Sequence, residues 1–78
     1  MCLIVVKGKD TVLPLEEHLR EGSSSNSDGI GVAYWKKDSK KVNIKKDFVN
    51  FSHFYFWLQN NVTNEDALIV HFRKATSG

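Results

Sequence analysis

The sequence predicts an α+β fold with the element order β-α-β-β-α-β, in which a mostly antiparallel sheet carries its helices on one face. Three observations lead to this prediction. Residues 2–6 form an uninterrupted apolar run, residues 67–73 alternate in the manner of a strand, and residues 51–58 repeat apolar side chains at helical spacing. A chain of 78 residues holds one small domain at most, so we expect a single domain over residues 1–78.

The first strand and the first helix come from the N-terminal quarter of the chain. Residues 2–6 are apolar and include β-branched members, which predicts a strand buried on both faces. Residues 14–21 predict a helix that begins at a proline, a residue suited to the first helical turn. Leu15 and Leu19 lie four positions apart and are expected to face the sheet together, and Gly22 is expected to cap the C-terminus.

The remaining elements follow from turn residues and alternation. A polar loop at residues 23–27 leads into a second strand at 29–35, and a turn at 37–40 leads into a third strand at 41–45. Asn50 is expected to cap a helix whose apolar stripe contains Phe51, Phe54, Tyr55 and Leu58. In the last strand, Leu68, Val70 and Phe72 are expected on one face, and Ile69, His71 and Arg73 on the other.

Composition excludes several classes of protein. The apolar content of 41% is that of an ordinary globular domain, which argues against disorder. No apolar run is long enough to span a membrane, and the N-terminus lacks the pattern of a signal peptide. A single cysteine cannot form an internal disulfide, which fits a reducing compartment, so we expect a cytoplasmic protein without a membrane partner.

Cys2 directly follows the initiator methionine, and removal of Met1 would make it the first residue of the mature chain. The free α-amine titrates at about 7.7–8.0 and the thiol at about 8.5, so the amine can act as a base for the thiol. An N-terminal nucleophile is activated in this way. The alternative is that Cys2 is a small buried residue at the start of a strand, as free cysteines often are.

Three motifs recur in one order. They are Met1-Cys2 opening an apolar strand, residues 27–35 with the sequence SDGIGVAYW, and residues 71–78, which have the form H-x-R-x-x-T-x-G. The sequence thereby resembles the N-terminal part of the class II glutamine amidotransferases, which are N-terminal nucleophile hydrolases, and is most similar to the small bacterial and phage amidotransferase-like branch. The resemblance implies an incomplete half of the αββα sandwich of that family.

The resemblance also implies roles for individual residues. Cys2 would attack the side-chain amide of glutamine, giving a thioester and ammonia. Arg73 would bind the α-carboxylate of glutamine, for which its planar guanidinium has the right geometry, and Thr76 would form a hydrogen bond to the same substrate. His71 is expected to orient the neighbouring backbone and not to act as a base. The alternative for Arg73 is a solvated cation at the end of a strand.

The resemblance places Asp28, Gly29 and Gly31 near the strand that carries the nucleophile. They are expected to serve geometry there, because glycine permits a positive φ or a close approach of another backbone. No nucleotide-binding glycine pattern surrounds them. His18, His53, His71 and Cys2 lack the spacing of zinc ligands. We therefore expect no metal and no cofactor.

The sequence departs from the family pattern at several positions. Leu3 stands where many members have glycine, Lys74 where an aromatic residue is frequent, and Ser77 where histidine is frequent. The family also uses an Asn-Gly pair for the oxyanion hole and an acidic residue for the substrate amine, both after the last motif. Because one oxyanion-hole donor is worth about 10²–10³ in rate, we expect the 78-residue chain to lack catalytic competence.

Two functions from different classes remain open. The first is an amidotransferase-like enzyme, and the second is a truncated, non-catalytic module that acts by binding a partner protein. For either function we expect self-association or a stable complex, through the edges at residues 2–6 or 67–73. Nucleic acid is not the expected partner, because the lysines alternate with apolar residues as the wet side of a hairpin. These lysines are Lys36, Lys37, Lys40, Lys41, Lys45 and Lys46.

Overall fold

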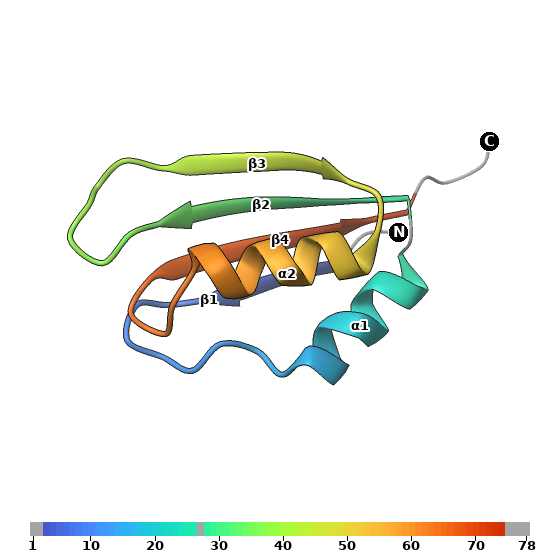
Figure 1. Ribbon diagram of the computed structural model, residues 1–78, viewed down its shortest axis with the longest axis horizontal. Helices are drawn as coiled ribbons and strands as arrows, with labels where there is room; N and C mark the ends of the chain where they lie inside the picture. Colours follow the sequence, from blue (N-terminus) through green and yellow to red (C-terminus); the bar gives the residue numbers. More distant parts are fainter. Residues whose placement is uncertain (1–2, 27, 75–78) are drawn as a thin grey trace.

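The computed structural model describes residues 3–26 and 28–74, which form a four-stranded antiparallel sheet and two helices (Figure 1). The α+β class and the predicted order of elements are confirmed, and the predicted bounds of the second and last strands agree with the structure. The elements are β1 (Leu3–Lys7), α1 (Glu16–Ser25), β2 (Gly29–Trp35), β3 (Asn43–Phe48), α2 (Phe51–Asn61) and β4 (Ala67–Arg73).

The strands lie in the order β1-β4-β2-β3, and each neighbouring pair is antiparallel. The last strand of the chain is thus inserted between the first and the second. β1 and β3 form the two edges of the sheet within the described residues. The expectation that residues 67–73 offer a free edge is therefore wrong, because β4 is paired on both sides.

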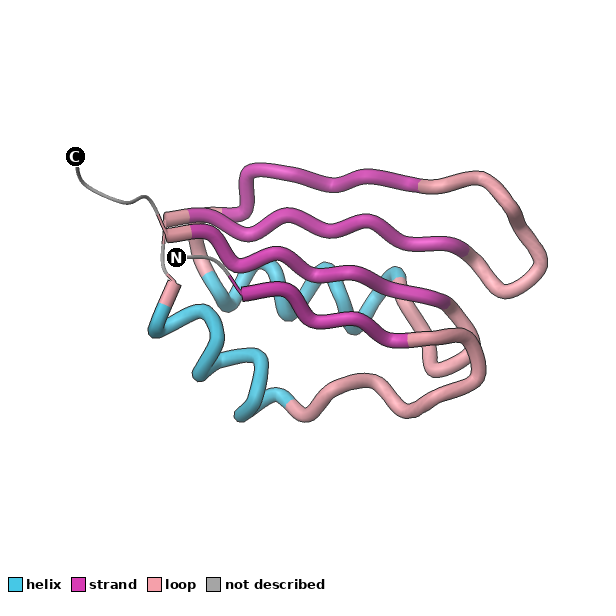
Figure 2. The backbone as a smooth tube through the Cα atoms, turned by 180° about the vertical axis from the view of Figure 1, so that it is seen from behind, coloured by secondary structure: helices cyan, strands magenta, loops and turns pink. Residues whose placement is uncertain are grey.

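Both helices cover the same face of the sheet, and Figure 2 shows the opposite face with no helix in front of it. Phe72 of β4 marks the covered face. Its ring lies 6.0 Å from the ring of Phe54 in α2, and a Cβ on Gly22 of α1 would be 3.0 Å from it. The core between the layers is formed by Leu19, Ile30, Val32, Phe54, Leu58, Val62, Leu68, Val70 and Phe72.

The apolar sequence of β1 predicted a strand buried on both faces, but the structure shows that one of its faces is exposed. Ile4 is 60% exposed and Val6 is 70% exposed. The physical reason is the position of the strand, since β1 is at an edge of the sheet and no helix covers the face that these side chains share. Lys7, the last residue of β1, is buried instead.

α1 begins and ends later than predicted. It spans Glu16–Ser25, so the serines expected in a loop belong to the helix, and Leu15 is its N-cap residue, 57% exposed. Leu19 alone of the expected leucine pair is buried. Gly22 is not a C-cap but an interior residue, where a Cβ would lie 2.9 Å from Cδ2 of Leu3 and 3.0 Å from the ring of Phe72. Glycine thus lets the helix approach the sheet closely.

α2 agrees with its prediction. Asn50 is the N-cap, and its side-chain oxygen accepts hydrogen bonds from the backbone N–H groups of Ser52 at 2.8 Å and His53 at 3.3 Å. Phe54 and Leu58 are buried, and Phe51 and Tyr55 of the predicted stripe pack partly buried against the core. The third strand is displaced, however, and runs from Asn43 to Phe48.

Neither helix in the described ranges is long and apolar enough to cross a membrane.

Candidate functional site

The face of the sheet that is turned away from both helices, called here the open face, carries Gly29, Gly31, His71 and Arg73 of the predicted site residues. β4 pairs with β2 so that Gly29 lies opposite Arg73 and Gly31 opposite His71. The predicted division of β4 into two faces is confirmed, since Leu68, Val70 and Phe72 are buried under the helices. The outward positions are Ile4 and Val6 of β1, Gly29, Gly31, Ala33 and Trp35 of β2, Ile44 and Lys46 of β3, and Ala67, Ile69, His71 and Arg73 of β4.

A shallow groove of about 360 Å³ extends along the open face from the end of β4 and the start of β2 to Ala33, Ile44 and Ile69 in the middle of the sheet. Glycine produces this hollow, because a Cβ on Gly29 or Gly31 would meet no atom within 4 Å. Gly29 also has a φ of 155°, a conformation that side chains rarely adopt. The wider lining comes from three strands and the segment after β3, and includes Asp28, Ile44, Lys46, Asp47, Val49, Ile69, His71 and Arg73.

Arg73 is exposed at the rim of the groove, and its backbone is fixed. The backbone N–H of Asp28 donates a hydrogen bond of 2.8 Å to the carbonyl oxygen of Arg73. This contact attaches the start of β2 to the end of β4.

His71 is exposed on the open face and lines the groove beside Arg73. Its ring forms no hydrogen bond within residues 3–26 and 28–74, so the structure gives it no part in holding the neighbouring backbone. Within the sheet, His71 pairs with Gly31 of β2 on one side and with Ile4 of β1 on the other.

The groove contains charges of both signs. Lys46 and Arg73 contribute positive charge, and Asp28 and Asp47 contribute negative charge. Asp47 has a φ of 67°, in the left-handed region, close to a register shift between β2 and β3. Aspartate tolerates this conformation better than most residues, and a bulge of this kind re-aims side chains at the edge of a sheet. The groove can thus accept a ligand that carries both an anionic and a cationic group.

Cys2 and Thr76 lie outside the described residues, as do the other predicted positions after Lys74. The structure does describe the strand that follows Cys2. Leu3 pairs with Phe72, so the described start of β1 lies beside the end of β4, one position from Arg73. The glycine segment of β2 is separated from β1 by β4.

An apolar row crosses the open face from one edge to the other. Val6 pairs with Ile69, Ile69 with Ala33, and Ala33 with Ile44, which places one side chain from each strand side by side. Val6 and Ile44, at the two ends of this apolar row, are 70% and 62% exposed. Antiparallel sheets with one face in water usually carry polar residues there. The charged or imidazole side chains of the described strands on this face, Lys46, Asp47, His71 and Arg73, all line the groove.

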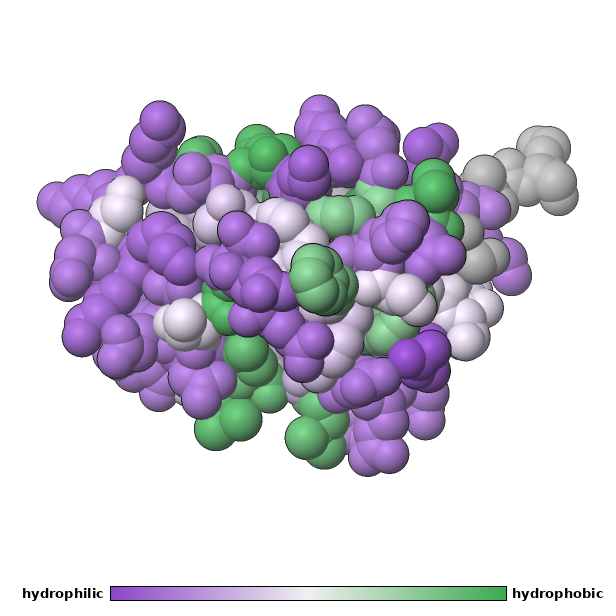
Figure 3. Space-filling view, in the orientation of Figure 1, coloured by the Kyte–Doolittle hydropathy of each residue, from purple (hydrophilic) through white to green (hydrophobic). Residues whose placement is uncertain are grey.

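The opposite side of the molecule has a different surface. Figure 3 shows the helix-covered side, where hydrophilic residues dominate and hydrophobic ones show mainly near the upper and lower margins. In residues 3–26 and 28–74, no group of three or more histidine, cysteine, aspartate and glutamate side chains is placed to hold a metal ion.

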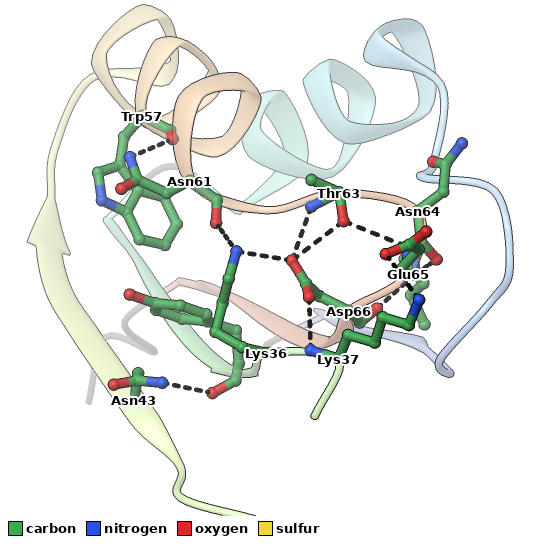
Figure 4. Close-up of polar contacts among 11 residues, drawn as sticks. Lys36, Lys37, Asn43, Trp57, Asn61, Thr63, Asn64, Glu65 and Asp66 are labelled. Atoms are coloured by element: carbon green, nitrogen blue, oxygen red, sulfur yellow. Dashed lines mark hydrogen bonds and ion pairs between the residues drawn. The ribbon is translucent and has the colours of Figure 1, made fainter. Parts of the chain in front are cut away.

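A buried carboxylate outside the groove joins three segments of the chain (Figure 4). Asp66 is 2% exposed, and its Oδ2 accepts hydrogen bonds from Lys36 Nζ at 2.8 Å and the Thr63 N–H at 2.9 Å. Its Oδ1 accepts a hydrogen bond of 2.8 Å from the N–H of Lys37. Burial alone would raise the pKa of Asp66, but these donors and the positive charge of Lys36 lower it to about 2.

Two lysines extend this cluster. Lys36 Nζ also donates to the carbonyl oxygen of Asn61 at 2.7 Å, which ties the end of α2 to the end of β2. Lys7 Nζ donates to the carbonyl oxygens of Gly8 at 2.9 Å, Asn64 at 2.8 Å and Asp66. Burial lowers the pKa of Lys7, although the negative charge of Asp66 opposes this effect. The cluster is thus a structural clasp at the end of the sheet opposite the groove.

Two charged residues at strand boundaries are the only trace of this clasp in the sequence. Lys7 ends an apolar strand, and Asp66 directly precedes another. A charged residue at each of these boundaries is ordinary, and only the antiparallel pairing of β1 with β4 brings the two together.

The chain matches no protein-family model and no curated protein, and no solved structure matches its fold.

Proposed function

We propose that this protein is a glutamine amidotransferase-like domain whose sheet is one incomplete half of an αββα sandwich. In this proposal the groove on the open face binds glutamine, and the Arg73 guanidinium binds the α-carboxylate. The motifs around Cys2, Gly29 and Arg73 support the family, and the open face supports the half-sandwich, because a sheet covered on one side only is what such a half would contain.

One observation carries the location of the site. Leu3 pairs with Phe72, so the strand that follows Cys2 and the strand that carries Arg73 are neighbours in a register that joins the start of one to the end of the other. Arg73 is also exposed at the groove. A nucleophile and a carboxylate-binding residue must lie within the length of one glutamine molecule, and this register is compatible with that requirement.

The proposed chemistry is that of the family. The thiolate of Cys2 attacks the carbon of the side-chain amide, the carbon–nitrogen bond breaks, and the nitrogen leaves as ammonia after taking up a proton. Water then cleaves the thioester, which releases glutamate and restores the thiol. Thr76 is proposed to form a hydrogen bond to the substrate. The described residues contribute binding and orientation to this reaction, through Arg73 and the glycine-lined hollow.

Isothermal titration calorimetry with L-glutamine tests the binding step without requiring catalysis. We expect Arg73→Gln to weaken binding by at least about tenfold, since a charge-assisted hydrogen bond contributes about 1.5–3 kcal/mol. Arg20→Gln is the matched control, because Arg20 is an exposed arginine on α1 whose partners are Glu16 and the ring of Phe51, neither of which lines the groove. A glutamine analogue with an amide in place of the α-carboxylate removes the other partner of the same contact. Its affinity for the wild-type chain should be no higher than the affinity of glutamine for Arg73→Gln. Equal binding of glutamine by both arginine variants would contradict the assignment.

A second candidate function is a non-catalytic interaction module. The apolar row favours it, because a sheet face with this composition is the kind that proteins cover. The groove and the apolar row overlap, since Ala33, Ile44 and Ile69 belong to both. A partner that covers the apolar row would therefore also cover part of the groove.

A further inference from the structure

We propose that the open face is the contact surface of a symmetric dimer, in which two copies of this chain stack sheet against sheet. This inference goes beyond the proposed amidotransferase-like function and does not depend on it. Two packed sheets lie about 10 Å apart with their strands within about 30° of each other. The helices of both copies would then form the two outer layers.

The composition of the open face carries the first step. The apolar row of Val6, Ile69, Ala33 and Ile44 spans all four strands without a polar interruption. Ile4 adds a further apolar side chain next to this row, 60% exposed. The charged residues lie at one end of the face, around the groove. An apolar centre with a polar rim is the usual anatomy of a protein interface.

The charges of the open face favour a second copy as the occupant. Lys46 and Arg73 balance Asp28 and Asp47 at the groove end, so two copies can meet without net repulsion. The rest of the chain is more basic, because the whole protein has a formal charge of +2. A strongly acidic partner would find more positive charge on the lysine-rich β2–β3 hairpin than on this face. A symmetric contact also requires a self-complementary patch, which a flat apolar row with balanced charges provides.

The area of the face determines how strong the contact can be. Four strands about 4.8 Å apart, each about six residues long at 3.3 Å per residue, form a face of roughly 19 by 20 Å. This is small beside the accessible surface of about 800 Å² per partner that stable complexes bury. We therefore expect a dimer that dissociates on dilution, and not a permanent one.

Sedimentation equilibrium over a concentration series from low micromolar to millimolar tests the proposal. The expected result is a mass that rises with concentration from the 8.9 kDa of one chain toward twice that value. Val6→Lys and Ile44→Lys should each raise the dissociation constant by at least about tenfold, because each removes an apolar contact worth about 1.5–3 kcal/mol. Both side chains are exposed in the single chain, so neither substitution disturbs the core.

The matched control is Val12→Lys. Val12 is 76% exposed, in the segment between β1 and α1, and is not on the open face. This variant should dimerise as the wild type does, and circular dichroism should confirm that all three variants are folded. Val6 and Ile44 belong to opposite edge strands, so a loss of association with Val6→Lys alone would indicate pairing through the β1 edge and would overturn the proposal. A mass of one chain at every concentration, or an equal effect of Val12→Lys, would overturn it too.

Discussion

Asp66 illustrates how a single residue connects segments that are distant in sequence. Its carboxylate receives hydrogen bonds from the end of β2 and the turn before β4, while its backbone carbonyl receives one from Lys7 of β1. A buried charge of this kind is stabilising only when its partners are in place. No local sequence pattern marks Asp66, because its partners come together only in the folded chain.

We expect Asp66→Asn to lower the free energy of unfolding at neutral pH by about 2 kcal/mol, because the amide cannot accept the same set of donors. Glu65→Gln is the control, since the neighbouring Glu65 side chain is 56% exposed and its ion pair with Lys37 is 3.5 Å long. Urea unfolding monitored by circular dichroism measures both. A loss no greater than that of the Glu65 variant would contradict a stabilising role for the clasp.

The pH dependence of stability follows from the same carboxylate. The pKa of Asp66 is lowered in the folded state to about 2, from an ordinary value of 3.8. Its contribution is therefore fully present above the unfolded pKa and is lost as the pH falls from about 4 through 2. Urea unfolding at a series of acidic pH values should show a shallower decline for Asp66→Asn than for the wild type in this window. Parallel declines would show that other groups determine the acid sensitivity.

Cys2 provides a prediction about activity. While Met1 is attached, the nitrogen of Cys2 is part of a peptide bond and has no basic lone pair to accept the thiol proton. We expect the 78-residue chain with Met1 in place to release no glutamate from glutamine. A coupled glutamate assay measures this, with Cys2→Ala as the background. Release that exceeds this background would contradict the prediction.

At the scale of elements, alternation and capping predicted well, and helix ends predicted poorly. The prediction of β4 was correct in the bounds of the strand and in the division of its side chains between two faces. The reason is that its buried apolar residues occur at every second position and face a covering layer. Asn50 was correct because an N-cap is a local interaction. The prediction that Gly22 caps the C-terminus of α1 was wrong, because the local sequence does not distinguish a C-cap glycine from a glycine that lets a helix contact a sheet.

Gly22→Ala tests this interpretation of α1. Alanine favours a helix by about 1 kcal/mol over glycine, but its Cβ would lie 3.0 Å from the buried ring of Phe72. Overpacking of this kind costs about 1–3 kcal/mol, so we expect a net loss of up to about 2 kcal/mol in the free energy of unfolding. The control is Gly8→Ala, where a Cβ would meet nothing within 4 Å. Stabilisation of the Gly22 variant would show that the helix does not approach the sheet as closely as described.

For the whole molecule, the sequence predicted the element order and the placement of both helices on one face of the sheet, but not the strand order. The insertion of β4 between β1 and β2 is a long-range pairing that no local pattern reveals. It explains two differences from expectation together. Residues 67–73 are central instead of at an edge, and residues 3–7 form an edge strand whose outer face is exposed. The same insertion brings Arg73 beside the start of β1. The spacing of the motifs along the sequence could suggest a shared site but not this pairing.

The location of the glutamine site is tested most directly by nuclear magnetic resonance, with an amide-resolved titration of the ¹⁵N-labelled chain with L-glutamine. We predict that the shifted amides cluster at the groove, at Gly29, Gly31, His71 and Arg73, while those of α2 remain unchanged. Shifts confined to another surface, or no shifts at saturating glutamine, would contradict the assignment of the open-face groove as the substrate site.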